Sequence, residues 1–284
     1  MTATTQTLAT GFVAPEDRRL PGALRLARVR AAMELRVFLR NRASLVFTIG
    51  FPVLLMLVLA SILTQPVGIP GVTLREVVVT GLIPVGVASV SFNGLGITMA
   101  IERDNGSVRR IGATPMPRSS YFLGKVALVI VTGVVETAIL IGIAVAFFGM
   151  HLPEAAATWA RIGWVLALGA IGCSLLAIAY SWLIPNARSA AALVTPVFVV
   201  LQFISGVFFP FNILPHWMQQ LAALFPLKWM VQGLQSALLP ASYQQAMPAG
   251  TWEVGKTAAV LGVWCVLGLL LCLASFRWRD AKVK

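Results

Sequence analysis

The stretch YFLGKVALVIVTGVVETAILIGIAVAFF, residues 121–148, is a long apolar run that holds only one lysine and one carboxylate. A helix needs about 20 predominantly apolar residues to cross the hydrocarbon core of a bilayer, which is about 30 Å thick. The run exceeds that length, so it is predicted to be a transmembrane helix. It places the chain among integral membrane proteins, and the neighbouring sequence is interpreted on that basis.

Five further stretches meet the same criterion of length and apolarity. They are Ser44–Leu63, Val77–Ile101, Ile162–Ile184, Ala190–Phe209 and Thr257–Phe276. Together with Tyr121–Phe148 they predict an all-α integral membrane protein with six transmembrane helices. The first 43 residues lack the apolar core of a signal peptide, so the first span is expected to direct insertion and to be retained.

The composition supports this class. The 284 residues are 58% hydrophobic and only 11% charged, whereas a soluble domain carries about 25% charged residues. The net charge of +12 would suggest nucleic acid in a soluble protein. Here the basic residues cluster beside apolar runs, so membrane topology explains them better and no nucleic-acid partner is expected. Catalytic motifs and metal-ligand clusters are not apparent in the sequence, so no catalytic or metal site is predicted.

The distribution of Lys and Arg predicts the orientation, because cytoplasmic loops carry an excess of these residues. Arginines crowd residues 1–43 and the connection 102–118, and basic residues fill the tail 277–284, whereas the connections near 64–75, 149–161 and 210–256 hold few. Both termini are therefore expected in the cytoplasm. The predicted division is a cytoplasmic segment 1–43, a transmembrane domain 44–276 and a basic tail 277–284. Abundant alanine, and arginine in excess over lysine, indicate a bacterial plasma (inner) membrane.

The stretch GTWEVGKT, Gly250–Thr257, matches the P-loop pattern G-x-x-x-x-G-K-[ST]. A working P-loop needs a preceding buried strand, a soluble helix after it and an acidic site for Mg²⁺. Here the segment is expected on the outer side and runs directly into the last span. The match is interpreted as accidental, and Lys256 is expected to reach the outer interface beside Trp252.

The segment before the first span predicts a basic amphipathic helix in the inner membrane interface. Its apolar stripe consists of Leu20, Leu24, Ala27, Ala31, Leu35 and Phe38, and its basic face of Arg25, Arg28, Arg36 and Arg40. Two roles remain open for this helix. It either anchors the chain and sets its topology, or it also transmits motion from a cytoplasmic partner.

The inner connection IERDNGSVRRIGATPMPRSSYFLGK, Ile101–Lys125, combines carboxylates, glycine, arginines and two prolines. The pattern predicts a short helix at Ser107–Gly112, bounded by Gly106 and by Thr114-Pro115. A simple inward loop needs positive charge but not this mixture. A short rigid helix that projects into the cytoplasm suits docking into a cleft on a soluble subunit, so residues 102–120 are the candidate coupling segment.

The outer block SGVFFPFNILPHWMQQLAALFPLKWMVQGLQ, Ser205–Gln235, is broken by prolines into apolar pieces too short to span. Such pieces are typical of re-entrant or interfacial segments, here placed within residues 205–240. They would form a lid over an exit, with Trp217 and Trp229 at the headgroup level. The alternative is a plain interfacial hairpin. The candidate gate residues are Phe209, Pro210, Pro215, Trp217, Pro226 and Trp229.

Both blocks resemble the permease subunits of ABC-2 type ABC exporters, especially the branch similar to the daunorubicin-resistance permeases. The acidic-Gly…Arg…Thr-Pro signature of that family is matched by ERDNGSVRRIGATPMP. The Gly-aromatic-Pro, Leu-Pro-x-Trp and apolar-Pro-Leu-x-aromatic elements are matched in the outer block. One departure is Arg109, where relatives often carry glutamate, and it leaves the charge pattern of a docking surface open.

The resemblance implies a permease that pairs with itself or with a close relative, as a homodimer or heterodimer, and two separate ATP-binding subunits. ATP and Mg would bind in those subunits, and no cofactor is expected in this chain. ATP-driven closure would act on the coupling segment and switch access to a central path for a small amphiphilic drug or lipid. The residues expected at the coupling site are Glu102, Asp104, Gly106, Arg109, Arg110, Thr114 and Pro115, with Arg36 and Arg40 beside them.

Glu136 is the notable polar residue inside a span, and a carboxylate at that depth is by default a functional candidate. It would line the substrate path, or it is protonated and hydrogen-bonded to a neighbouring helix. Gln202 and Asn93 are weaker path candidates, since such residues often bond neighbouring helices together. An ion-coupled secondary transporter and a non-transporting assembly scaffold remain alternative functions. The first would need more intramembrane charges or inverted repeats.

Overall fold

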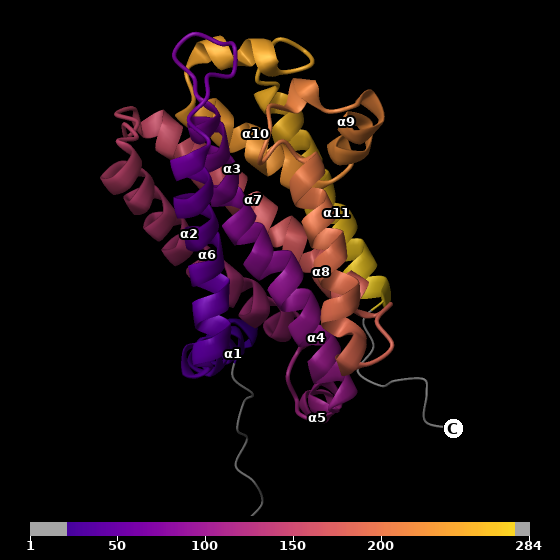
Figure 1. Ribbon diagram of the computed structural model, residues 1–284. Helices are drawn as coiled ribbons and strands as arrows, with labels where there is room; N and C mark the ends of the chain where they lie inside the picture. The colour runs from indigo at the N-terminus through magenta and orange to yellow at the C-terminus, as the bar shows by residue number, and fades with distance from the viewer. Residues whose placement is uncertain (1–21, 276–284) are drawn as a thin grey trace, which may run out of the picture.

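A computed structural model describes residues 22–275 of the chain (Figure 1). The described part is helical, and its only β pairing is an isolated antiparallel bridge between Pro66 and Thr73. Leu20, the rest of residues 1–21 and the basic tail 277–284, which entered the predictions above, lie outside the described residues, as does Phe276.

Six helices are long and apolar enough to cross a membrane, which confirms the predicted class and number of spans. The spans are α2 (Arg42–Ile62), the second span Leu74–Asp104, α6 (Arg118–Phe148), α7 (Ala156–Ser181), α8 (Ala187–Ile204) and α11 (Val254–Ser275). The helix α8 ends before the expected Phe209, because Gly206 adopts a left-handed conformation with φ of 78°. Backbone in that region favours glycine and ends the helix.

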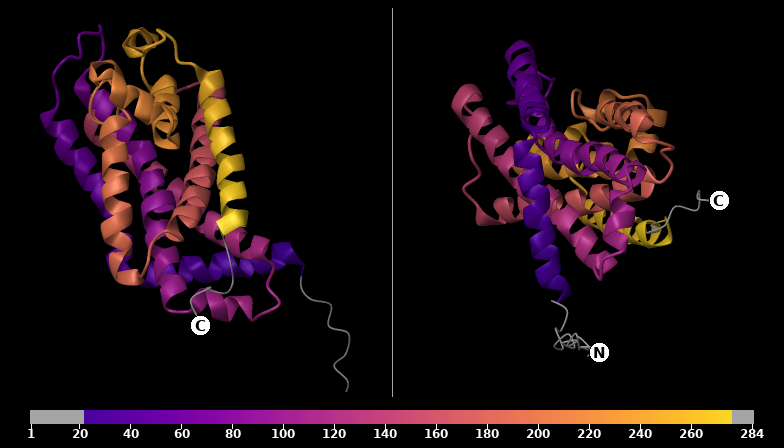
Figure 2. Two further views of the ribbon diagram at one scale, coloured as in Figure 1. Left: turned by 90° about the vertical axis from the view of Figure 1, so that its right-hand side faces the viewer. Right: turned by 90° about the horizontal axis from the view of Figure 1, so that it is seen from below.

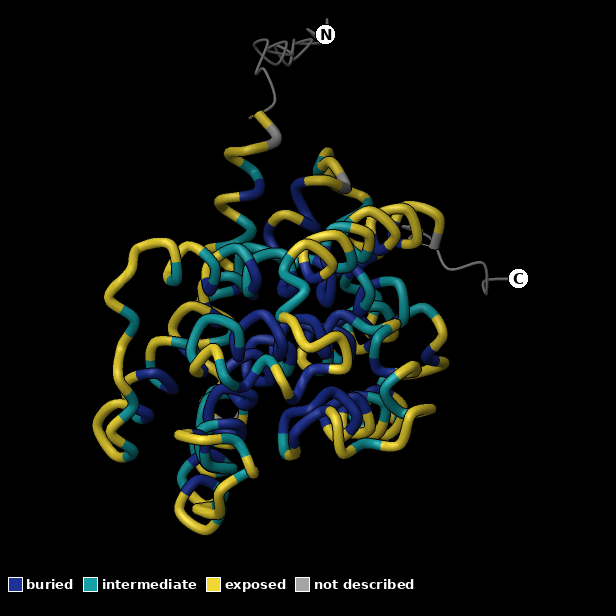
Figure 3. Tube along the Cα trace, turned by 90° about the horizontal axis from the view of Figure 1, so that it is seen from above, coloured by how far each residue is buried: buried dark blue, intermediate teal, exposed yellow. Residues whose placement is uncertain are grey.

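The second span is the centre of the bundle. It consists of α3 (Leu74–Ala88), the π-helix η1 (Ser89–Gly94) and α4 (Leu95–Asp104) in one continuous run. In an apolar 18-residue stretch of this span 83% of the residues are buried, against 17% in the corresponding stretch of α2 and 22% in that of α11. The helix α3 contacts α2, α6, α7 and the shorter helix α10 (Pro226–Leu238). Seen along the bundle, buried segments lie at the centre and exposed ones at the rim (Figure 3).

The π-helix in this span fixes its neighbours on one side. Asn93 accepts a hydrogen bond from the Thr195 hydroxyl at 3.1 Å, which joins η1 to α8. Phe92 packs its ring against Tyr180 of α7 and Phe198 of α8, with centroids 5.9 and 6.5 Å away. A π-helical turn inside a span often occurs at functional sites. Here the π-helix connects the second span to α7 and α8. Asn93 forms an interhelical hydrogen bond, which is the alternative role considered for it above.

Short helices cover the two ends of the bundle (Figures 1 and 2). At one end, α1 (Ala23–Arg40) and α5 (Ser107–Gly112) lie across the spans. At the other end lie the short 3-10 helix η2 (Phe211–Ile213), α9 (His216–Ala223), part of α10, and the 3-10 helix η3 (Ala241–Ala246). We refer to them as the α5 end and the α9 end.

Candidate functional site

The helix α5 is a short projecting element whose geometry follows from its sequence (Figure 1). Gly106 turns the chain with φ of 73°, a left-handed conformation that glycine adopts without a steric penalty. The Asn105 side chain then accepts a hydrogen bond from the Ser107 backbone N–H at 3.0 Å. Val108 is buried and anchors the helix on the bundle. The short helix predicted at Ser107–Gly112 is confirmed.

The outer surface of α5 and the neighbouring face of α1 are basic. The coupling residues that are exposed at this end are Arg36, Arg40, Asp104, Arg109, Arg110, Thr114 and Pro115, so the arginines outnumber the one carboxylate. The Arg110 guanidinium donates to the Ser107 hydroxyl at 3.2 Å, and Thr114 donates to the Ile111 carbonyl at 2.6 Å. These local bonds hold the side chains close to α5. The arrangement offers a positively charged surface to an acidic partner.

Directly behind α5 lies a group of five side chains that we call the buried charge cluster: Arg30, Glu34, Glu102, Tyr121 and Lys125. The Lys125 ammonium forms ion pairs with both carboxylates, at 2.8 Å to Glu34 and closer to Glu102. The Tyr121 hydroxyl donates to Glu102 at 2.7 Å, and Arg30 pairs with Glu34. Two cations and two carboxylates thus balance one another in a group that is buried at Lys125 and Glu34 and half-buried at Arg30 and Glu102.

The cluster joins three elements that are distant in sequence. Arg30 and Glu34 belong to α1, Glu102 to α4, and Tyr121 and Lys125 to α6. Lys125 is fully buried. Removing one member of a buried ion pair leaves an uncompensated charge, which is strongly unfavourable. The cluster therefore holds α1, α4 and α6 together at the point where the chain enters α5.

The residues after Glu102 tie the same helix to its other neighbour. The Arg103 guanidinium donates to the carbonyl of Ser181 at 2.8 Å and also to that of Ile184, while Asp104 accepts from the Ala187 backbone N–H at 3.0 Å. Both contacts lie in the turn between α7 and α8. Movement of α4 is thereby linked to two further spans, α7 and α8.

These contacts bear on the expected coupling site. Glu102, expected at a docking surface, is half-buried, and its carboxylate bonds to Tyr121 and Lys125 within the chain. Asp104 also accepts a hydrogen bond within the chain, but it remains exposed at this end. Arg30, Glu34, Tyr121 and Lys125 were not foreseen as site residues. The sequence signal for two of them was a charge within an apolar stretch, namely Glu34 in the stripe of α1 and Lys125 in a span.

The expected stripe of α1 also differs in part from what the structure shows. Ala27 is buried, and Ala31, Leu35 and Phe38 are half-buried, whereas Leu24 is exposed. The buried side of α1 packs on α6. The charged cluster residues share that side, which explains why apolarity alone did not identify it.

Glu136 lies where α6 packs against α3, and its side chain is fully buried. Within residues 22–275 neither carboxylate oxygen has a hydrogen-bond partner. Gly86 of α3 provides the space, since a Cβ atom there would lie 2.6 Å from Oε1 of Glu136. Gln202 of α8 is also buried. The hydrogen bond from Glu136 to a neighbouring helix, considered as its alternative state, is not present in the described chain.

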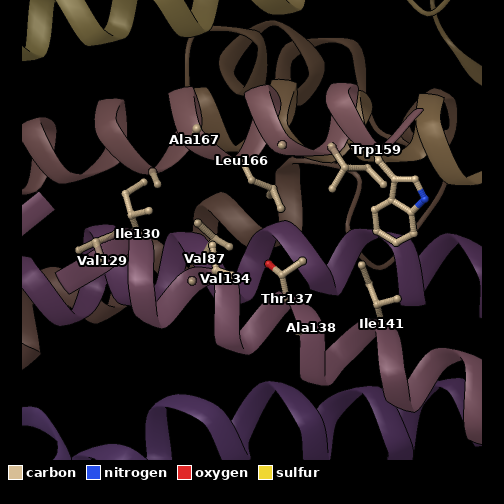
Figure 4. Close-up of a pocket in the computed structure, with 14 residues that line it drawn as sticks. Val87, Val129, Ile130, Val134, Thr137, Ala138, Ile141, Trp159, Leu166 and Ala167 are labelled. Carbon is tan, nitrogen blue, oxygen red and sulfur yellow. The ribbon is translucent and has the colours of Figure 1, made fainter. Parts of the chain in front are cut away.

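An apolar cavity of about 300 Å³ lies between α6 and α7 and was not foreseen from the sequence (Figure 4). Val134, Thr137 and Ile141 line it from α6, and Leu166 lines it from α7. Trp159 lies at one end of it, where its indole N–H donates to the Pro153 carbonyl at 2.9 Å. Because both helices are membrane spans, the cavity suits an acyl chain or another apolar group.

The candidate gate residues divide into exposed and buried groups at the α9 end. Phe209, Pro215 and Trp217 are exposed, and Pro210 and Pro226 are buried. Trp229, expected at the headgroup level, is instead buried, and its indole N–H donates to the Ala223 carbonyl at 2.8 Å. The segment does form two short helices, α9 and α10, with Pro226 as the first residue of the second.

Comparison with known proteins follows from this arrangement of six spans and a projecting helix between the second and third. The profile of the family described as "ABC-2 type transporter" matches residues 28–239, which is more than half of the chain. The chain belongs to the ABC-2 type transporter family. The matched region includes most of α1, the buried charge cluster, α5 and all of α10.

One curated protein is similar to this ABC-2 chain over about half of its length. "Putative transport permease ycf38" of Porphyra purpurea is 25% identical over 149 residues. The chain spans about half the length of the curated relative it matches, with 50% of that protein and 51% of this chain covered. This chain is thus a multi-pass transport permease component, and its family implies an ATP-binding partner in general.

The P-loop-like stretch has local geometry unlike a nucleotide site. Residues 250–257 follow the 3-10 helix η3 and a turn, and the span α11 begins at Val254 within the motif. At this position of the described chain no strand comes before the glycine. Lys256 pairs with Glu253, three residues earlier. The motif forms the entrance to a span rather than a phosphate loop.

Proposed function

We propose that this ABC-2 chain is the permease subunit of an ATP-driven exporter that moves a small amphiphile, a drug or a lipid, by alternating access. ATP would be hydrolysed by separate nucleotide-binding subunits, two of them with two permease chains. The observation that carries the proposal is the position of α5: a basic helix exposed on one side and backed by the buried charge cluster on the other.

The cluster supplies a mechanical path for coupling. A displacement of α5 by the partner subunit would move α4 directly. It would reach α1 and α6 through the ion pairs of Lys125. The hydrogen bonds of Arg103 and Asp104 extend the same motion to α7 and α8. Rigid, polar contacts transmit small displacements because they tolerate little stretching. The proposed partner would therefore tilt several spans when its two nucleotide-binding subunits close.

The proposed placement is the plasma (inner) membrane of a bacterium, with the α5 end and both termini in the cytoplasm. Support comes from the excess of arginine near that end and from its scarcity in the opposite connections. In that placement α9 and α10 lie at the outer surface, where they would gate the exit. The basic face of α1 would meet anionic lipid headgroups.

Co-purification from native membranes tests the proposed energy source. We expect affinity purification of the full chain in mild detergent to recover an ATP-binding-cassette subunit in equal copy number by quantitative mass spectrometry. Reversing charge on α5 with Arg110→Glu should lower that recovery at least about tenfold, since docking charges mainly steer and fix the complex. Arg188→Glu, which makes the same charge change at the start of α8, serves as the matched control.

The alternatives predict different results in the same experiment. Recovery of the chain without an ATP-binding subunit, even after gentle crosslinking, would contradict ATP-driven export. An ion-coupled secondary transporter would then be tested by transport driven with an imposed ion gradient. A scaffold would show neither ATP-dependent nor gradient-dependent transport.

We further propose that Glu136 lines the substrate path. Gln202 and Asn93 are weaker candidates for the same role. The reason is energetic. A buried carboxyl group without a hydrogen-bond partner destabilises the fold, and proteins usually keep such a group only where function needs it. Glu136→Met, of similar length, is expected to raise the free energy of unfolding by about 1–3 kcal/mol. The same variant is expected to lower export in reconstituted vesicles at least about tenfold, a loss of about 1.4 kcal/mol in transition-state stabilisation.

Glu136→Gln is the matched control for that variant, because it keeps an unpartnered polar group of the same shape. It should lower export without the gain in stability. Full export of every tested substrate by a folded Glu136→Gln protein would contradict the path role.

A further inference from the structure

A second cavity, of about 410 Å³, lies at the α9 end and contains the only two lysines of the described chain outside the buried charge cluster. We call it the α9-end pocket. It is formed by η2, α9, α10, the turn before α11 and the first turn of α11. The residues used in the argument are Phe211, His216, Lys228, Trp229, Glu253 and Lys256.

Lys228 is a buried cation on the wall of this pocket. The residue is only 5% exposed, and its ammonium lies over the Trp229 ring, 3.6 Å from the centroid, and 5.1 Å from that of Phe211. Its hydrogen bond goes to the side-chain oxygen of Gln232. Within residues 22–275 no carboxylate lies at ion-pair distance from it. An ammonium has three donors, so donors remain for a ligand.

The partner of this lysine is itself held in place. Gln232 donates its side-chain N–H to the Trp252 carbonyl at 2.6 Å, which turns its oxygen toward Lys228. The Trp252 ring stacks on Tyr243, with centroids 6.0 Å apart. The ammonium is therefore fixed before any ligand arrives. A preorganised donor loses less entropy on binding than a mobile one.

The remaining charges of the pocket leave it positive. Glu253 pairs with Lys256, and this pair balances itself. Among the described residues Lys228 is then left without an ion-pair partner, and the exposed His216 adds a further donor at the rim. Glu253 has φ of 44°, the one non-glycine residue with a positive φ in the described chain. Strained backbone of this kind often occurs at binding sites.

Burial lowers the pKa of Lys228 to about 8, while Glu253 acts to raise it and Lys256 acts to lower it. The lysine thus remains largely charged near neutral pH in spite of its apolar surroundings. A charge that is removed from water without a partner is unfavourable. An anion in the pocket would supply the missing partner.

We propose that the α9-end pocket binds a phosphate group, with Lys228 as the buried cation and Lys256 at the rim. Phosphate fits because its several oxygens accept from Lys228, from Lys256 when it leaves Glu253, and from His216. The group would come from the headgroup of an amphiphile or from free phosphate. The stretch GTWEVGKT, which is no P-loop, thus contributes Lys256 to a phosphate site of another kind.

If the phosphate belongs to a transported amphiphile, the pocket receives the headgroup at the exit of the permease. That part of the inference rests on the proposed export function. Binding itself does not depend on export, and it is measured on the permease chain alone. A failure of ATP-driven transport and a failure of phosphate binding are therefore separate results.

Isothermal titration of the full chain in uncharged detergent tests the site. The probes are inorganic phosphate and the short-chain lipids dihexanoyl phosphatidylglycerol (anionic) and dihexanoyl phosphatidylcholine (zwitterionic). We expect phosphatidylglycerol to bind more tightly than phosphatidylcholine. Lys228→Met should weaken its binding at least about tenfold, as expected for loss of a charged hydrogen-bond donor. Lys228→Arg should retain binding within a few-fold, and Arg188→Gln, the matched charge change at the α5 end, should leave it unchanged.

The probes separate the two sources of phosphate. Binding of phosphatidylglycerol without inorganic phosphate supports a lipid headgroup, and binding of inorganic phosphate at similar affinity supports the free ion. Equal affinities of the unmodified chain and a folded Lys228→Met variant would overturn the proposal, as would no binding of either anion. Should Lys228→Met not fold, Ala249→Phe, which fills the pocket from its exposed rim, must abolish binding for the proposal to stand.

Discussion

Lys125→Met is expected to lower the free energy of unfolding by about 3–5 kcal/mol, the usual cost of removing one partner of a buried ion pair. The substitution keeps the length of the side chain but leaves Glu34 and Glu102 without the ammonium that they share. The two neighbouring carboxylates would then share only the Arg30 guanidinium, which leaves one negative charge uncompensated at the junction of α1, α4 and α6. Equilibrium unfolding in mixed micelles, monitored by circular dichroism, measures the loss.

The double variant Lys125→Met with Glu102→Gln should recover part of the lost free energy of unfolding, because it removes one of the two carboxylates that Lys125 neutralises. Lys256→Met is the matched control. Its ammonium pairs with Glu253 but is 69% exposed, and such a surface pair contributes about 0–1 kcal/mol. If Lys125→Met and Lys256→Met unfold at similar denaturant concentrations, the buried charge cluster does not hold this end of the bundle together.

Gly81→Ala is expected to have the second large effect, a loss of about 3 kcal/mol or a failure to fold. A Cβ atom on Gly81 would lie 2.7 Å from the carbonyl oxygen of Val207 and 2.9 Å from its Cα. Both are backbone atoms, which cannot rotate away as a side-chain tip can, so α3 and the turn after α8 must separate. Overpacking of a tight core costs about 1–3 kcal/mol, occasionally more. Thermal unfolding of the detergent-solubilised chain measures it.

Gly142→Ala, in α6, is the control for this prediction. A Cβ atom there meets no other atom within 4 Å, and alanine is favoured over glycine inside a helix by about 1 kcal/mol. The control should therefore be neutral or stabilising. A Gly81→Ala protein with the melting temperature of the Gly142→Ala protein would show that α3 and Val207 are not in close contact.

The spans and the projecting helix could be predicted because their signals are local. Twenty or more apolar residues determine a membrane-spanning helix whatever their neighbours are. The same holds for α5, where Gly106 and the Thr114-Pro115 pair bound the helix at both ends. The end of α8 was less certain, because Gly206 and the apolar residues up to Phe209 allow more than one stopping point.

The partners of charged residues could not be predicted in the same way. Glu102 and Lys125 lie 23 positions apart in sequence, and nothing in the sequence says that both point inward. The same is true of Arg103, which bonds to carbonyl groups of Ser181 and Ile184. Glu102 was predicted at an exposed docking surface, whereas its ion pair with Lys125 gives it a structural role.

The sequence by itself determined the membrane class, the six spans, the short helix α5 and the ABC-2 resemblance, because apolar length, proline and glycine act on the chain within a few residues. Only the tertiary structure decided which carboxylates form ion pairs within the chain and where Glu136 lies. It also decided that Lys228 lines a pocket and has no ion-pair partner among the described residues. The physical reason is that the role of a charged side chain depends on the groups that surround it in space. Those surroundings come from helices that are far apart in the chain.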